Sequence, residues 1–206
     1  LTTDEKKRIL VNNIHGVDID QQAVEVTKLS LLLKVLEEET GQLTLGFERA
    51  LPDLNDNIKC GNSLIGWDYF EGQLLPDEEE VARVNPFDWD KAFPEVFTSG
   101  AKGGFDAVIG NPPYVRQESL GDDKNYYKTQ YKVYTGTADL YSYFIEKGIS
   151  LLRKGGVFSY IVANKWLRAR YGKPLRIWLK TQCIEEITDF GDLPVFEGAT
   201  TYPCII

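Results

Sequence analysis

Residues 111–114 of this 206-residue chain, Asn-Pro-Pro-Tyr, have the side chains needed to hold a flat heterocycle that carries an amino group. The Asn111 side chain has a carbonyl acceptor, and Pro112 keeps a backbone carbonyl but lacks an N–H. Two acceptors on one exocyclic amine would bind both its hydrogens and stabilise positive charge on its nitrogen during methyl transfer. The Tyr114 ring can stack on the base. The alternative is an ordinary proline-rich strand end.

Polar side chains also follow two other short apolar runs. Asp18 comes after Ile14–Val17, and an acid there can accept hydrogen bonds from both hydroxyls of a ribose. An ordinary strand-end acid explains Asp18 equally well, and Asp20 is expected to cap the following helix. Asn62 follows a second short strand, where its amide could reach an adenine edge, although Gly-Asn-Ser is also a common turn.

The elements that must position these residues alternate between strands and helices. Strands are expected at 14–17, in 57–66 (a short strand followed by a turn), at 105–110, at 157–164, at 184–190 and from 201, and helices at 21–39, 140–154 and 173–182. Asp139 is expected to cap the second of these helices. The segment 67–104 is predicted to be an irregular acidic insertion with one short helix. This order predicts an α/β, doubly wound, mostly parallel sheet with ligands beyond the strand ends.

The composition excludes several classes of protein. Hydrophobic residues make up 43% and charged residues 26%, as in soluble globular proteins. Three scattered cysteines and one histidine argue against a metal site and favour a reducing cytoplasm. No apolar run approaches the roughly 18 residues of a membrane span. The chain has no methionine, which we interpret as a piece of a longer polypeptide.

The net charge of −8 argues against general nucleic-acid binding, but the charge is unevenly distributed. Two segments, 122–134 and 164–180, combine basic residues with aromatic ones. They predict a basic face that contacts a nucleic-acid backbone, although a basic run is more often simply a solvated surface. The candidate backbone contacts are Lys128, Lys132, Lys165, Arg168 and Arg170.

An ordered set of motifs extends over nearly the whole chain, except 67–104. The motifs are "IHGVDID", "GNSLIG", "FDAVIGNPPYVRQE", "ADLYSYFIEKGISLLRKGGVFSYIVANKWL" and "FGDLPVFEGATTYPCII". The set resembles the adenine-N6 DNA methyltransferases of type IIG restriction–modification and phage-exclusion systems. The resemblance implies a Rossmann-like fold, S-adenosyl-L-methionine as cofactor, and double-stranded DNA with a flipped adenine as substrate.

The resemblance also assigns roles to residues. Asp18 matches the acid that binds the cofactor ribose, and Asn62 stands where the family often has an aspartate that contacts the cofactor adenine. The amine grip corresponds to Asn111, Pro112 and Tyr114, and Phe196 matches an aromatic residue that packs on the flipped base.

Two family features are not found in the sequence. The Gly-rich first cofactor motif should precede residue 14, but "LTTDEKKRIL" has no glycine, so the central first strand is expected to be missing. The target-recognition domain expected after residue 206 is also outside the chain. We therefore expect a partial catalytic domain whose partners are the rest of the parent polypeptide, with or without a nuclease domain, and which is inactive alone.

Two other functions are compatible with these motifs. Asn-Pro-Pro-Tyr also occurs in protein-glutamine methyltransferases that act on release factors. A non-catalytic DNA-binding or scaffold domain could keep the fold, and Asn62 together with the missing Gly-rich turn favours that alternative slightly.

Overall fold

The computed structural model describes residues 1–36, 52–97, 103–115, 121–193, 195–196 and 202–206, and these residues form two compact units. The first unit is Leu1–Phe93 and the second is Pro94–Ile206. Each unit contains helices and a sheet, so the predicted α/β class is confirmed.

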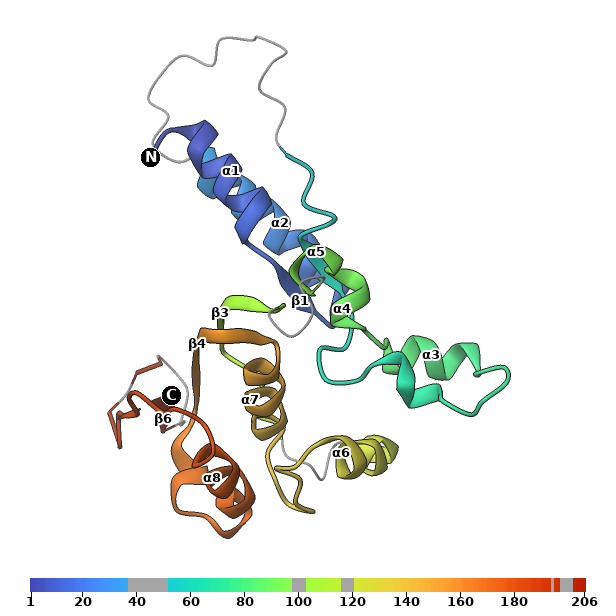
Figure 1. The fold of residues 1–206 in the computed structure, drawn as a ribbon, viewed down its shortest axis with the longest axis vertical. Helices are drawn as coiled ribbons and strands as arrows, with labels where there is room; N and C mark the ends of the chain where they lie inside the picture. Colours follow the sequence, from blue (N-terminus) through green and yellow to red (C-terminus); the bar gives the residue numbers. More distant parts are fainter. Residues whose placement is uncertain (37–51, 98–102, 116–120, 194, 197–201) are drawn as a thin grey trace. The chain divides into compact units, whose positions relative to one another are not determined.

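The first unit pairs two short parallel strands with two longer helices. Its elements are α1 (Thr3–Asn13), β1 (Gly16–Asp18), α2 (Gln21–Leu36), β2 (Ile58–Cys60), the 3-10 helix η1 (Trp67–Phe70), α3 (Glu78–Val84) and α4 (Trp89–Ala92). Strands β1 and β2 are parallel, with Val17 opposite Lys59. Helices α1 and α2 lie side by side (Figure 1).

A small apolar core holds these elements together. It consists of Leu10, Val24, Val35, Leu54 and Ile58, all buried. The buried Asn57 side chain stabilises the same region, because its Nδ2 donates to Val11 O at 2.7 Å and to Ile14 O at 2.9 Å. The end of α1 is thereby fixed to the residue that precedes β2.

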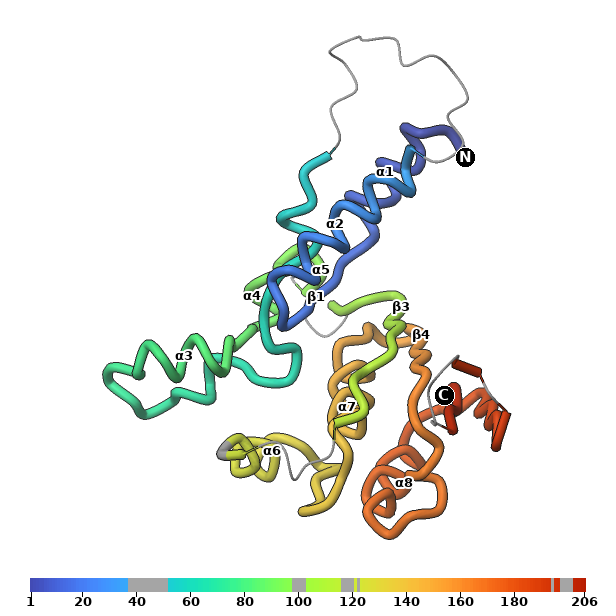
Figure 2. The backbone as a smooth tube through the Cα atoms, turned by 180° about the vertical axis from the view of Figure 1, so that it is seen from behind, coloured from blue at the N-terminus to red at the C-terminus, as the bar shows by residue number. Residues whose placement is uncertain are grey.

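The second unit contains a four-stranded mixed sheet. Its elements are α5 (Pro94–Phe97), β3 (Phe105–Gly110), the 3-10 helix η4 (Gly121–Asp123), α6 (Lys124–Gln130), α7 (Tyr141–Ser150), β4 (Leu152–Ala163), the 3-10 helices η5 (Asn164–Leu167) and η6 (Arg170–Gly172), α8 (Lys173–Leu179), β5 (Thr188–Asp189) and β6 (Pro203–Ile205). The strand order is β3-β4-β6-β5, and α7 lies along β3 and β4 (Figure 2).

One strand of this sheet differs in direction from the prediction. Strands β3 and β4 are parallel, with Gly110 opposite Tyr160, but β6 runs antiparallel to both β4 and β5. Strand β5 thus runs in the same direction as β3 and β4, so the prediction of a mostly parallel sheet fails only for β6. The sequence marks where a strand lies, but its direction depends on pairing with a distant segment.

The segment 67–104 is more ordered than predicted. Its described part contains η1, α3, α4 and α5 rather than one short helix. The acidic run at its centre is a helix start, because Asp77 accepts a hydrogen bond from Glu80 N and three glutamates occupy the first turn of α3. Negative side chains stabilise a helix N-terminus, so this run is not merely a charged surface.

Two expectations about α7 are also corrected. The N-cap is Leu140, whose apolar side chain cannot cap the helix, and the Asp139 carboxylate accepts a hydrogen bond from Tyr171. The helix ends at Ser150, and residues 152–156 already belong to β4, which contains a bulge opposite the start of β3. Gly155 adopts the left-handed conformation that this irregularity requires, with φ of 78°.

Candidate functional site

The end of β3 presents a polar side chain and an aromatic ring beside two prolines. Asn111 and Pro113 are exposed, Pro112 is buried and Tyr114 is half-buried. Gly110 leaves room for the Tyr160 ring on the neighbouring strand, because a Cβ at this position would lie 2.8 Å from that ring. The Asn111 amide makes no hydrogen bond within the described residues, so its carbonyl can accept one from a ligand.

The Tyr114 ring is supported from the second unit's interior. It meets the buried Tyr141 ring edge to face, with centroids 6.2 Å apart and planes at 83°. The phenol donates a hydrogen bond to Ile161 O at 3.5 Å, the outer limit for such a bond. Burial, and secondarily the Cys204 thiol, raises the pKa of Tyr114, so the phenol stays neutral at physiological pH.

A backbone hydrogen bond fixes the next residue to the start of α7. Leu140 N donates to Val115 O at 2.8 Å. The segment that contains Asn111 and Tyr114 is thus attached to α7 and its N-cap by the Tyr114–Tyr141 ring contact and by this hydrogen bond. The part of the Tyr114 ring that does not contact Tyr141 is available to a flat ligand.

Phe196 is half-buried in the second unit. Residues 197–201, which follow it in the matched motif, lie outside the described residues. Its role against a flipped base therefore stays a prediction.

At the end of β1, an exposed carboxylate is oriented by the backbone around it. Asp18 Oδ1 accepts from Asp20 N at 2.8 Å, and Asp18 O accepts from Gly61 N at 2.8 Å. Asp20 caps α2 as predicted, because its Oδ1 accepts from Gln22 N at 2.9 Å. The second carboxylate oxygen of Asp18 stays available to a hydroxyl group.

At the end of β2, the Asn62 amide is largely engaged within the protein. Its Oδ1 accepts from Leu64 N at 3.1 Å and its Nδ2 donates to Val84 O at 3.2 Å. Its backbone N donates to Asn85 O at 2.6 Å. This is the turn that the sequence analysis gave as the alternative role of Asn62. One amide hydrogen and one lone pair of Asn62 remain for an adenine edge.

Asn85 is a residue of this region that the sequence analysis missed. It ends α3 in the left-handed conformation, with φ of 48°. Its Nδ2 lies 3.4 Å from Ile19 O, and its carbonyl accepts from Asn62 N, so it contacts the residues that follow both β1 and β2. An asparagine that follows a helical segment and precedes a proline indicates a helix C-cap, and this signal in the sequence could have identified Asn85.

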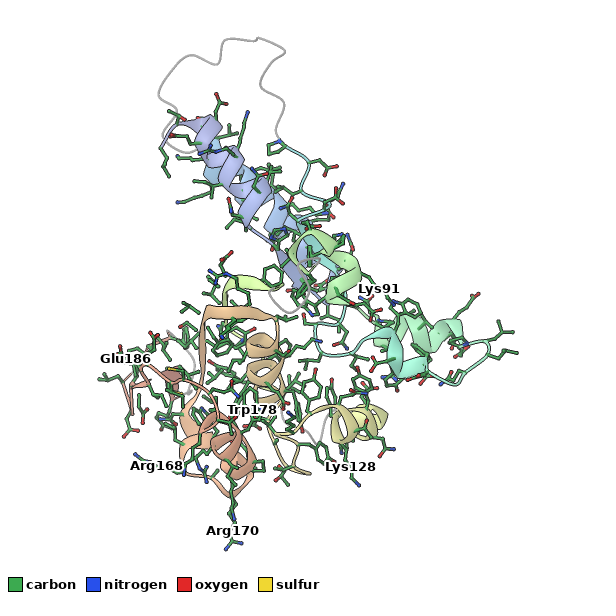
Figure 3. The ribbon with its side chains drawn as sticks, in the orientation of Figure 1. Lys91, Lys128, Arg168, Arg170, Trp178 and Glu186 are labelled. Carbon is green, nitrogen blue, oxygen red and sulfur yellow. The ribbon has the colours of Figure 1, made fainter. Side chains whose placement is uncertain are left out.

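The five predicted backbone-contact residues all have exposed side chains in the second unit. In Figure 3 the Arg168, Arg170 and Lys128 side chains extend away from the ribbon. Arg176 differs from them, because its guanidinium donates to Trp166 O and, at 2.9 Å, to Ala169 O. Arg176 thus fixes the segment from which Arg168 and Arg170 project.

Searches for two other kinds of site gave no candidate in the described ranges. Histidine, cysteine, aspartate and glutamate side chains there form no group of three or more that could hold a metal ion. None of the helices described is both long enough and apolar enough to span a bilayer.

Comparison with known sequences identifies relatives. Residues 12–196 match the family described as Eco57I restriction-modification methylase. The chain is 33% identical over its whole length to the type II restriction enzyme and methyltransferase RM.Eco57I of Escherichia coli, covering 20% of that protein. It is 29% identical over 92% of its length to the type II methyltransferase M.BanIII of Aneurinibacillus aneurinilyticus, covering 27% of it. Half of the chain is 36% identical to the type II methyltransferase M.PaeR7I of Pseudomonas aeruginosa.

Proposed function

Because the chain belongs to the Eco57I restriction-modification methylase family, we propose that its protein transfers a methyl group to the N6 amine of adenine in DNA. The protein would act within a restriction–modification or anti-phage system. The chain spans about a fifth to a quarter of the first two relatives above, so it would be part of a larger catalytic protein. The observation that carries the proposal is the exposed Asn111 amide, which has no protein partner among the described residues and lies between a strand end and the Tyr114 ring.

The proposed chemistry at the end of β3 needs no general base before transfer. Asn111 Oδ1 and Pro112 O would accept the two hydrogens of the adenine amine. The nitrogen lone pair would then point out of the base plane towards the methyl carbon. As the new C–N bond forms, the two oxygens would stabilise the positive charge on nitrogen, and a proton would afterwards leave to water.

S-adenosyl-L-methionine would supply the methyl group as a sulfonium, whose sulfur takes the electron pair of the broken S–C bond. The donors and acceptors after β1 and β2 fit such a cofactor. The exposed Asp18 carboxylate keeps one oxygen for the ribose hydroxyls, and Asn62 keeps one amide hydrogen for the adenine.

The target base must leave the duplex before it can reach Asn111, at a cost of a few kcal/mol. Stacking on an aromatic side chain returns roughly 1–3 kcal/mol, which Tyr114 would provide on one side and Phe196 on another. The exposed basic side chains would contact the DNA backbone. They are Lys128, Lys132, Lys165, Arg168 and Arg170.

Methylation by the full-length protein tests the proposal. Unmethylated bacterial DNA and, in a parallel reaction, a purified release factor are incubated with S-adenosyl-L-methionine carrying a labelled methyl group, and the labelled nucleosides or amino acids are identified by mass spectrometry. We expect N6-methyladenine, and a loss of about 100-fold to 1,000-fold for Asn111→Ala, as for removal of one group that stabilises transition-state charge. Asn125→Ala is the control, because Asn125 is an exposed asparagine of the same unit. Unchanged methylation by Asn111→Ala would reject the amine grip, and label in a release factor instead of DNA would favour a protein-glutamine methyltransferase.

A further inference from the structure

A line of three polar side chains lies behind the Tyr114 ring and joins segments that are far apart in the sequence. The Tyr171 hydroxyl lies 2.9 Å from Asp139 Oδ2 and 2.9 Å from the Tyr141 hydroxyl. Tyr141 is fully buried, and its ring makes the edge-to-face contact with Tyr114. The line therefore begins at a half-buried carboxylate and ends at the aromatic ring of the candidate site.

The proton positions in this line follow from the number of donors. A neutral phenol has one hydrogen, and Tyr171 gives its hydrogen to the Asp139 carboxylate. The contact between the two phenols must then be a hydrogen bond from Tyr141 to Tyr171. Burial raises the pKa of Tyr141 well above its usual range, so it remains a donor at any pH at which the protein works.

We propose that Asp139, Tyr171 and Tyr141 are positioning residues that hold the Tyr114 ring at the angle needed to stack on the target base. This inference rests on the proposed function. The hydrogen-bonded line fixes the position of the Tyr141 hydroxyl and therefore the tilt of its ring, and the edge-to-face contact with Tyr141 limits the tilt of the Tyr114 ring. The hydrogen bond of Tyr114 to Ile161 O is too long to fix the ring by itself.

The same line extends the effect to the basic segment. Tyr171 lies in η6, directly after Arg170, one of the proposed DNA-backbone contacts. A displacement of η6 on binding the backbone would shift the Tyr171 hydroxyl and, through Tyr141, the ring that receives the base. Tyr171 would thus couple the contact of Arg170 with the DNA backbone to the stacking of the target base on Tyr114.

Removing single oxygen atoms tests this in the full-length protein. Tyr171→Phe breaks both hydrogen bonds but keeps the ring, and we expect kcat for DNA methylation to fall about 10-fold to 100-fold. The KM for S-adenosyl-L-methionine should stay within about twofold, because the cofactor contacts are unaltered. Tyr143→Phe is the matched control. Tyr143 is equally buried on the same helix, and its hydroxyl donates to Thr135 O at 3.4 Å rather than to this line.

Asp139 provides the conservative rescue and the test of coupling. Asp139→Asn keeps an oxygen acceptor for Tyr171 and should retain most of kcat, whereas Asp139→Ala should lose as much as Tyr171→Phe. The double variant Tyr171→Phe/Asp139→Ala should have a kcat no lower than that of either single variant, because all three variants break the same line of hydrogen bonds.

Two outcomes would overturn the inference. The first is wild-type kcat for Tyr171→Phe in a protein whose Asn111→Ala variant is inactive, which leaves the proposed function standing. The second is equal loss of kcat and of thermal stability in Tyr171→Phe and Tyr143→Phe, which would make the line merely structural. If Asn111→Ala were itself fully active, the proposed function would fail instead.

Discussion

The residues after β1 and β2 and those after β3 are both strand ends with polar side chains, but they are held in different ways. In the first region, Asp18 and Asn62 already accept hydrogen bonds from backbone N–H groups nearby. In the second, the Asn111 amide has no hydrogen-bond partner in the described part of the chain, and its neighbourhood is aromatic.

This difference matches two tasks. The parts of a ligand that do not react are bound well by groups whose orientation is fixed beforehand, even where those groups keep only part of their hydrogen-bonding capacity. A group that must stabilise charge during a reaction needs its full acceptor free. We therefore propose that the first region binds the part of a ligand that does not react and that the second region holds the reacting group. Each prediction below separates the two.

After the loss expected for Asn111→Ala, the largest effect is expected at Tyr114. Tyr114→Ala removes the stacking surface and should lower kcat/KM for DNA by about 10-fold to 100-fold, the equivalent of 1–3 kcal/mol. Tyr114→Phe keeps the ring and loses only the 3.5 Å bond to Ile161 O, so it should retain most activity. Steady-state methylation kinetics measure both variants. Equal losses in the two would show that the hydroxyl, rather than the ring face, carries the function.

What the sequence could predict in these regions was local. The strand at Phe105–Gly110, the Asp20 cap and the helix containing Pro174 are confirmed, because each depends on residues within one or two turns. The first of these features also places Asn111 at a strand end.

What it could not predict depends on contacts between distant segments. Asp139 fits the sequence pattern of a cap, but its carboxylate binds Tyr171, which is 32 residues away. Asn85 lies in a segment interpreted as irregular, although it contacts the residues after β1 and β2. The antiparallel course of β6 also follows from partners that no local pattern records.

A second test concerns Asp18. Asp18→Asn keeps an acceptor for Asp20 N but loses the charge, so hydrogen bonds to the ribose weaken. A charged hydrogen bond contributes about 1.5–3 kcal/mol, so the KM for S-adenosyl-L-methionine should rise about 10-fold or more while kcat is nearly unchanged. Asp20→Asn is the control, since asparagine caps a helix equally well. A fall in kcat without a change in KM would contradict the binding role.

A third test asks whether Asn85 holds the first region. Asn85→Gly and Asn85→Ala both remove the Nδ2 contact with Ile19 O, but only alanine is strained at φ of 48°. Alanine should therefore unfold about 1 kcal/mol more easily than glycine in urea titration. Both variants should raise the KM for S-adenosyl-L-methionine by the same few-fold. If neither variant alters this KM, the orientation of Asp18 and Asn62 does not depend on Asn85.

The smallest effect is expected in the free energy of unfolding at alkaline pH, where it arises from buried groups of the second unit. Burial raises the pKa of Tyr160 to about 12 and that of the Cys204 thiol to about 11, and both residues lie in the second unit. A raised pKa means that the folded state keeps its proton when the unfolded state has lost it. The stabilisation is therefore complete below the unfolded pKa, near pH 9 for the thiol and 10 for the phenol, and decreases as pH rises towards 11–12.

Tyr160→Phe isolates this contribution, because phenylalanine has no proton to lose. Relative to the wild type, the variant should gain about 1 kcal/mol of unfolding free energy between pH 8 and pH 11, since one pKa unit corresponds to about 1.4 kcal/mol. Urea titrations at the two pH values, followed by circular dichroism, measure the change. The opposite result would be a free energy of unfolding that falls no faster in the wild type than in Tyr160→Phe over this range. Tyr160 would then ionise as freely in the folded second unit as in the unfolded chain. In that case water would reach the aromatic residues of the second unit, and the Tyr114 ring would not be supported by an interior that excludes water.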